Sequence, residues 1–146
     1  TPGKWTGSLA YVFGNTGLIS VDYALKDYSS TKFTPKNEFQ NSNNEITNNL
    51  TTAGELRIGG EYKIKQWSLR GGFRNEQSPY KNKNTYGDLT GYSCGLGYNF
   101  GATKLDLAYS TAQINSQQAY FSQGLTDPAS IKTRNNNITL SLLFEL

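Results

Sequence analysis

The stretch Ile138-Thr139-Leu140-Ser141-Leu142-Leu143-Phe144-Glu145-Leu146 closes the sequence and alternates apolar with polar side chains. Only Leu143 interrupts the alternation. A period of two predicts a β-strand with one apolar and one polar face, because successive side chains of a strand point to opposite sides. A last strand that ends on an apolar residue is typical of bacterial outer-membrane β-barrels, and such a barrel is therefore the leading expectation.

Six earlier stretches alternate in the same way, so we expect seven strands. They lie roughly at 4–14, 17–29, 50–64, 66–77, 88–101, 103–115 and 134–146. Tight turns at 14–17, 63–66 and 100–103 alternate with longer polar connections near 30–49, 78–87 and 116–133. In outer-membrane barrels the short turns are periplasmic and the long loops extracellular. This orientation places the C-terminus, Leu146, in the periplasm and Thr1 on the extracellular side.

Seven strands that begin outside the cell make an incomplete barrel, since single-chain bacterial barrels have an even number of strands. A sheet left open in lipid would expose two edges of unpaired backbone groups. We therefore expect further barrel strands before Thr1, on a separate chain or a cleaved segment. The alternative is an eighth strand within 31–49 that closes a small barrel.

Composition limits the other classes of protein. The 146 residues suffice for one domain, and the mean hydropathy of −0.60, with no run of 18 apolar residues, excludes a membrane helix. Barrel strands, in which about half of the side chains are polar, remain compatible with it. A net charge of +3 with scattered basic residues argues against nucleic acid. With no His and only Cys94, we expect no catalytic residue, no cofactor and no metal site.

The predicted strands have one apolar and one polar face. The apolar face carries Trp5, Leu9, Tyr11, Phe13, Ile19, Val21, Tyr23, Leu25, Leu56, Ile58, Tyr62, Ile64, Trp67, Leu69, Phe73, Tyr92, Cys94, Leu96, Tyr98, Phe100, Leu105, Leu107 and Tyr109, with the apolar residues of the last strand. Its aromatic residues gather beside the tight turns, where a periplasmic aromatic girdle would lie. On the polar face, opposite charges lie on neighbouring strands, as a water-filled lumen requires. Glycines on this face would leave room for large side chains of neighbouring strands. A soluble β-sandwich with its apolar faces inward remains the alternative.

The segments 5–14, 17–23, 59–62, 68–74, 87–92 and 95–101 resemble, in order and spacing, the C-terminal half of FadL-type outer-membrane transporters. The resemblance implies a fourteen-stranded antiparallel transmembrane β-barrel, of which this all-β chain would be half. It also implies passive transport of hydrophobic compounds such as long-chain fatty acids across the Gram-negative outer membrane. The family's hatch and kinked strand belong to the N-terminal half and are not in this sequence.

The resemblance sets the expected contacts. Partners would be outer-membrane lipid and lipopolysaccharide, a hydrophobic substrate, the remaining barrel strands and, in one alternative, membrane-complex subunits. Lumen residues that would face a substrate are Arg57, Arg70, Arg74, Glu61 and Asp106. Loop residues that would form an apolar collecting surface are Phe33, Phe39, Tyr80, Tyr86, Tyr120 and Phe121. Lumen ion pairs and loop packing are the alternative roles of the two sets. A subunit or shuttle of a secretion complex and a general diffusion porin are the alternative functions.

Overall fold

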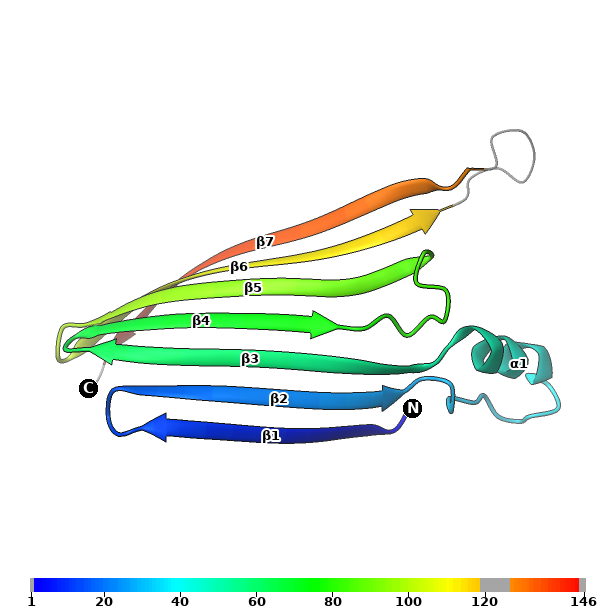
Figure 1. The fold of residues 1–146 in the computed structure, drawn as a ribbon, viewed down its shortest axis with the longest axis horizontal. Helices are drawn as coiled ribbons and strands as arrows, with labels where there is room; N and C mark the ends of the chain where they lie inside the picture. Colours follow the sequence, from blue (N-terminus) through cyan, green and yellow to red (C-terminus); the bar gives the residue numbers. More distant parts are fainter. Residues whose placement is uncertain (1, 119–126, 145–146) are drawn as a thin grey trace.

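The computed structural model describes residues 2–118 and 127–144. These residues form seven strands and one helix: β1 (Lys4–Phe13), β2 (Gly17–Asp27), α1 (Gln40–Asn49), β3 (Thr52–Ile64), β4 (Trp67–Glu76), β5 (Tyr86–Asn99), β6 (Thr103–Gln118) and β7 (Ala129–Phe144). All seven strands join in one antiparallel sheet in sequence order (Figure 1). The expected all-β fold is confirmed, and the described residues do not form a two-sheet sandwich.

The three tight turns lie together at one end of the sheet, which we call the turn end. They occupy Gly14–Thr16, Lys65–Gln66 and Phe100–Ala102, as the sequence predicted. Gly14 and Gly101 have φ values of 55° and 104°, a region in which glycine is unstrained. The longer connections and α1 lie at the opposite end, the loop end (Figure 1).

The connection 30–49 differs from the expectation, because α1 occupies its second half. The alternative of an eighth strand within 31–49 is therefore wrong. Asn-rich sequence is a poor helix former, and contacts outside the helix stabilise this one. The Asn43 amide donates to the Phe33 carbonyl over 3.1 Å and accepts from the Phe33 N–H over 2.8 Å. This pair of bonds fixes the loop against the helix.

The hairpin of β6 and β7 is longer than predicted. The strand β6 ends at Gln118 rather than near 115, and β7 begins at Ala129 rather than near 134. Their pairing continues to Gln118 and Ala129. Polar side chains on both faces, such as Gln117 and Gln118, left no period of two in this part of the hairpin.

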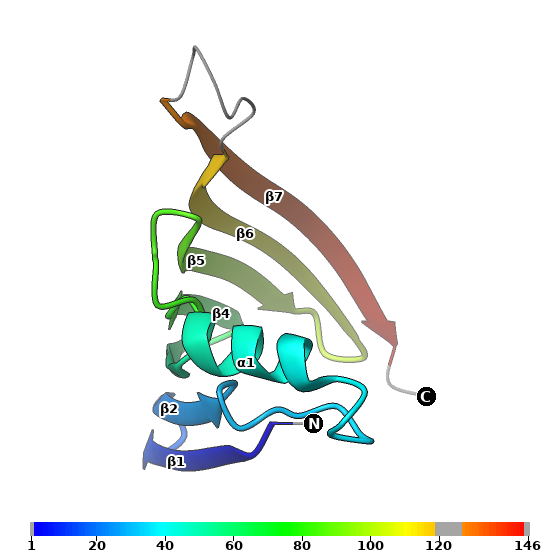
Figure 2. The same ribbon diagram turned by 90° about the vertical axis from the view of Figure 1, so that its right-hand side faces the viewer.

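The sheet is curved, with α1 lying at its loop end (Figure 2). Its described residues bury only two hydrophobic side chains, Ala24 and Ala53. Within the described part of the chain, no helix is long and apolar enough to cross a membrane. Most of the large apolar side chains of the strands are instead exposed on one face, and this face is the starting point for function.

Candidate functional site

Strand register gathers the apolar side chains into rows across one face of the sheet. One such row runs through Leu9, Val21, Ile58, Phe73 and Tyr92, each paired with the next across neighbouring strands. The side chains between them point to the other face and are mostly polar. The predicted division into an apolar and a polar face is confirmed for the described residues.

The apolar face is unusually exposed. Trp5, Leu9 and Ile138 are 82%, 76% and 77% exposed, and most of the other large residues of this face are exposed too. A continuous apolar surface of this extent is typical of a protein that contacts lipid or another protein.

The apolar residues of this face form a belt across the sheet. The edge of the belt nearer the loop end, called its upper edge, runs obliquely to the strands. Its last apolar residue toward the loop end is Trp5 on β1, Leu56 on β3, Phe73 on β4 and Ile138 on β7. Beyond it, on the same face, lie polar residues: Asn75, Thr90, Thr111, Gln113, Arg134 and Asn136. The edge descends toward the turn end by three rows, which is six residues along a strand, between β1 and β7.

The lower edge of the belt descends in the same direction. It moves by two rows, from Phe13 on β1 through Trp67 on β4 to Phe144 on β7. With ~3.4 Å per residue and ~4.8 Å between strands, the two edges slope at about 25–35° to the hydrogen-bond direction. The belt is therefore horizontal only when the strands are tilted by that angle.

The belt also has a defined height. Its two ends are eight residues apart on β1 (Trp5 and Phe13) and β3 (Leu56 and Ile64), and six residues apart on β4 (Phe73 and Trp67) and β7 (Ile138 and Phe144). These spans correspond to about 27 Å and about 20 Å along the strand, or about 22–25 Å and about 17–19 Å along the normal at that tilt. The apolar band of a transmembrane barrel is ~25 Å tall.

Aromatic rings line the lower edge of the belt at the turn end. The ring centroids of Trp67 and Tyr98 are 4.7 Å apart, and those of Tyr98 and Phe100 are 4.6 Å apart. Tyr11 and Phe13 form a similar edge-to-face pair at 4.8 Å. Among the rings predicted to form a girdle beside the turns, Trp67, Tyr98 and Phe100 are thus in contact with one another.

The polar face is organised around Arg70. Its guanidinium bridges Glu61 at 3.1 Å and Asp106, on β3 and β6 respectively. Gly97 makes room for this bridge, because a Cβ there would overlap the Asp106 carboxylate. A Cβ on Gly95 would make an ordinary contact with the Arg70 side chain. The arrangement supports the ion-pair role for Arg70, Glu61 and Asp106.

Arg57 and Arg74 have a different environment. They face each other directly across β3 and β4, and each pairs with a glutamate of its own strand, Glu55 and Glu76. Each arginine side chain remains about half exposed, at 53% and 43%. Two like charges in direct register destabilise a sheet, and both point toward the same hollow.

This hollow, of about 570 Å³, lies on the polar face. Its floor follows one register row, Ser20, Gly59, Gly72, Ser93 and Ser110. Because the two glycines carry no side chains, the floor is low. Arg57 and Arg74 occupy the adjacent row toward the loop end, and Glu61 and Arg70 the adjacent row toward the turn end. The serines and glycines of this row were predicted to lie on the polar face, but their alignment becomes visible only once the register is known.

Two loops pack together at the loop end. Lys81 donates its N–H to the Asn49 carbonyl and its ammonium to the Thr47 carbonyl, both over 2.9 Å, at the C-terminal end of α1. The Thr51 N–H donates to the Pro79 carbonyl over 2.8 Å. Neither contact was predicted, because loop-to-loop contacts leave no periodic signal in the sequence.

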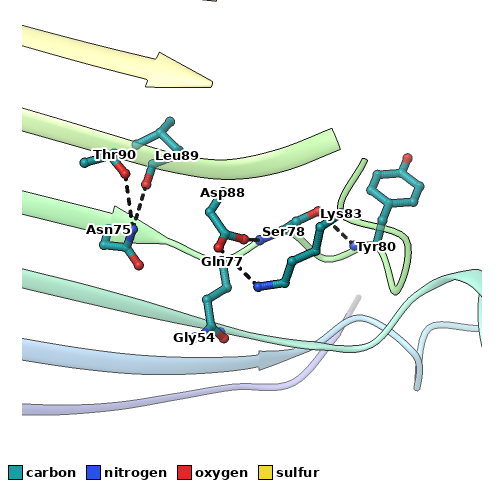
Figure 3. Close-up of polar contacts among 9 residues, drawn as sticks. All are labelled: Gly54, Asn75, Gln77, Ser78, Tyr80, Lys83, Asp88, Leu89 and Thr90. Atoms are coloured by element: carbon teal, nitrogen blue, oxygen red, sulfur yellow. Dashed lines mark hydrogen bonds and ion pairs between the residues drawn. The ribbon is translucent and has the colours of Figure 1, made fainter. Parts of the chain in front are cut away.

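Asp88 anchors the second of these loops to the sheet (Figure 3). Its carboxylate accepts the Ser78 N–H over 2.8 Å and pairs with the Lys83 ammonium at 3.1 Å. It lies at the loop end, four residues beyond Tyr92, the last apolar residue of the belt on β5. Burial acts to raise the pKa of Asp88, but the Ser78 hydrogen bond and the Lys83 charge outweigh it and lower the pKa. The anchor is therefore charged at neutral pH.

The loop aromatics form two separate pairs. Ring centroids are 5.6 Å apart in Phe33–Phe39 and 6.2 Å apart in Tyr80–Tyr86, and all four side chains are partly exposed. Tyr120 and Phe121 lie outside the described residues. Among the residues that are described, no three His, Cys, Asp or Glu side chains are placed to hold a metal ion.

Comparison with protein-family models, with curated proteins and with solved structures found no match to this chain.

Proposed function

We propose that this sheet is part of the wall of a Gram-negative outer-membrane β-barrel that passively transports hydrophobic compounds such as long-chain fatty acids. The observation that carries the proposal is the oblique apolar belt. Transmembrane barrel strands are tilted by ~35–45° and carry an apolar band ~25 Å tall. The slope and height of the belt approach both values, whereas a surface that packs on another protein has no reason to follow a plane oblique to the strands.

The two free edges of the sheet support a larger barrel. Both β1 and β7 run from the loop end to the turn end. Direct pairing of these strands would be parallel, and so would pairing with a second copy in the same orientation. An antiparallel barrel therefore needs an odd number of added strands, of which the first and last run from the turn end to the loop end. Seven added strands, as the FadL resemblance implies, meet this condition.

The transport role is supported by the two faces of the sheet and by its loop end, because an apolar solute would have to cross the outer membrane. The apolar belt would contact lipid and lipopolysaccharide, while the charged face would enclose water. The exposed Phe33–Phe39 and Tyr80–Tyr86 pairs lie at the loop end, where an apolar solute would arrive. These features support capture and passage of a solute that is poorly soluble in water.

A general diffusion porin is the second candidate, because the polar face carries paired charges at Arg70 and small residues at its floor. Such a lumen would also admit water-soluble solutes.

The test is growth of a Gram-negative host that lacks its own fatty-acid transporter on oleate as sole carbon source, combined with conductance of the purified protein in planar bilayers. We expect growth to be restored with little steady ion conductance. Large steady conductance without growth would establish a porin. Failure of both would reject an outer-membrane transport function.

A further inference from the structure

The hollow on the polar face has the composition of a binding site for an anionic head group. Its donors converge from four strands: the guanidiniums of Arg57 and Arg74 on β3 and β4, and the hydroxyls of Ser20 and Ser93 on β2 and β5. The carboxylates of Asp22 and Glu61 also line the hollow. Guanidinium groups bind carboxylate and phosphate oxygens through paired hydrogen bonds. We propose that this hollow binds the head group of an amphipathic anion, an inference that rests on the proposed transport function and names its substrate class.

The floor of the hollow leaves space for a ligand to come close to the backbone of the sheet. A Cβ on Gly72 would lie 2.6 Å from Ser93 Oγ, and a Cβ on Gly59 would lie 3.4 Å from Ser20 Oγ. The two hydroxyls therefore lean over the glycines from opposite sides. In the described structure, neither hydroxyl is bonded to another protein group, so both can donate to a ligand. A side chain at either glycine would fill the space above the sheet.

The three arginines that face this hollow are not equivalent. Arg70 is held between two carboxylates, Glu61 and Asp106, and contributes little net charge. Arg57 and Arg74 each pair with one glutamate, lie in direct register and repel each other. Arg57 also lies directly opposite Asp22 on β2. An anion between them would relieve this repulsion. The head-group site is thus assigned to Arg57 and Arg74, and Arg70 serves as the wall of the hollow.

An apolar surface lies next to the head-group site. Val12 and Leu18 pair across β1 and β2 on the same face as the hollow, and both are exposed. Leu18 also lines the hollow. The row of Leu18 is four residues from the row of Arg57, which is about 14 Å along the strand at ~3.4 Å per residue. An alkyl tail of about ten carbons or more would reach from one to the other.

The experiment is equilibrium dialysis of the complete folded protein in nanodiscs against radiolabelled laurate, dodecyl phosphate and dodecanol, with binding to empty nanodiscs subtracted. We expect both anions to bind more tightly than dodecanol, and the tighter of the two identifies the head group. In the variant R57Q/R74Q the anions should bind about tenfold more weakly, because two partly exposed charge-assisted contacts are lost, while dodecanol binding should hardly change.

Two further variants separate binding from folding. K36Q/K132Q removes the same charge from the loop end and the opposite face, away from the hollow, and should bind laurate like the parent. R57K/R74K keeps the charge without the paired donors and should recover part of the affinity. Anion binding that is unchanged in R57Q/R74Q, or equal for laurate, dodecyl phosphate and dodecanol, overturns the inference. Transport with unchanged anion binding would reject this site alone, and anion binding without growth on oleate would reject the transport function alone.

Discussion

Leu96 is the most informative position at which to place a charge. It lies on β5 midway between Tyr92 and Phe100, the first residue after the strand, which mark the two edges of the belt here, and it is flanked in register by Leu69 and Leu107. Each edge is about 14 Å away along the strand, or about 11–12 Å along the normal at the inferred tilt. Arginine near the middle of the apolar band of a barrel costs ~2–4 kcal/mol. We expect L96R to lower the free energy of unfolding in phospholipid vesicles by that amount.

The matched control is Thr139→Arg. Thr139 lies inside the belt on β7, one residue from its upper edge at Ile138, but points to the polar face. This change should alter stability by no more than about 0.5 kcal/mol, as at an ordinary wet surface. Urea titration of the vesicle-inserted protein, followed by gel mobility with and without heating, measures both variants. Equal effects of the two arginines, or a larger effect at Thr139, would refute the assignment of faces.

Two further predictions concern local packing. G97V should lower the free energy of unfolding in urea titration by an amount on the order of 1 kcal/mol, because its Cβ would displace the Asp106 carboxylate from its arginine partner. G95A meets only ordinary contacts and should hardly change the free energy of unfolding. Equal losses in the two variants would show that the ion pair contributes nothing to stability. N43A should expose the loop around Phe33 to limited proteolysis, because both hydrogen bonds that hold it are lost, and an unchanged cleavage pattern would contradict the anchoring role.

Most of the sheet was predictable, because a strand with one polar and one apolar face shows a period of two directly in its sequence. The tight turns at Gly14 and Gly101 were equally clear from their glycines. The prediction failed where that signal was absent. The helix α1 has no apolar stripe and depends on contacts such as those of Asn43, which sequence alone does not reveal.

The polar face was predictable only in part. Alternation placed Arg57, Arg70 and Arg74 on one face, but it could not say which of them would be neutralised. That depends on register: Arg70 lies directly opposite Glu61 and reaches Asp106 across Gly95, while Arg57 and Arg74 lie opposite each other. The oblique course of the belt likewise needs the pairing of all seven described strands.

The most direct test of the central claim uses the single cysteine. Cys94 is exposed on the apolar face between Gly71 and Tyr109, inside the belt. A nitroxide attached there, in the protein inserted into vesicles, should collide with oxygen far more than with a water-soluble nickel chelate. In C94S/S93C the label moves one residue, to the polar face, and the preference should reverse. A label at position 94 that collides mainly with the nickel chelate would contradict contact between this face and lipid.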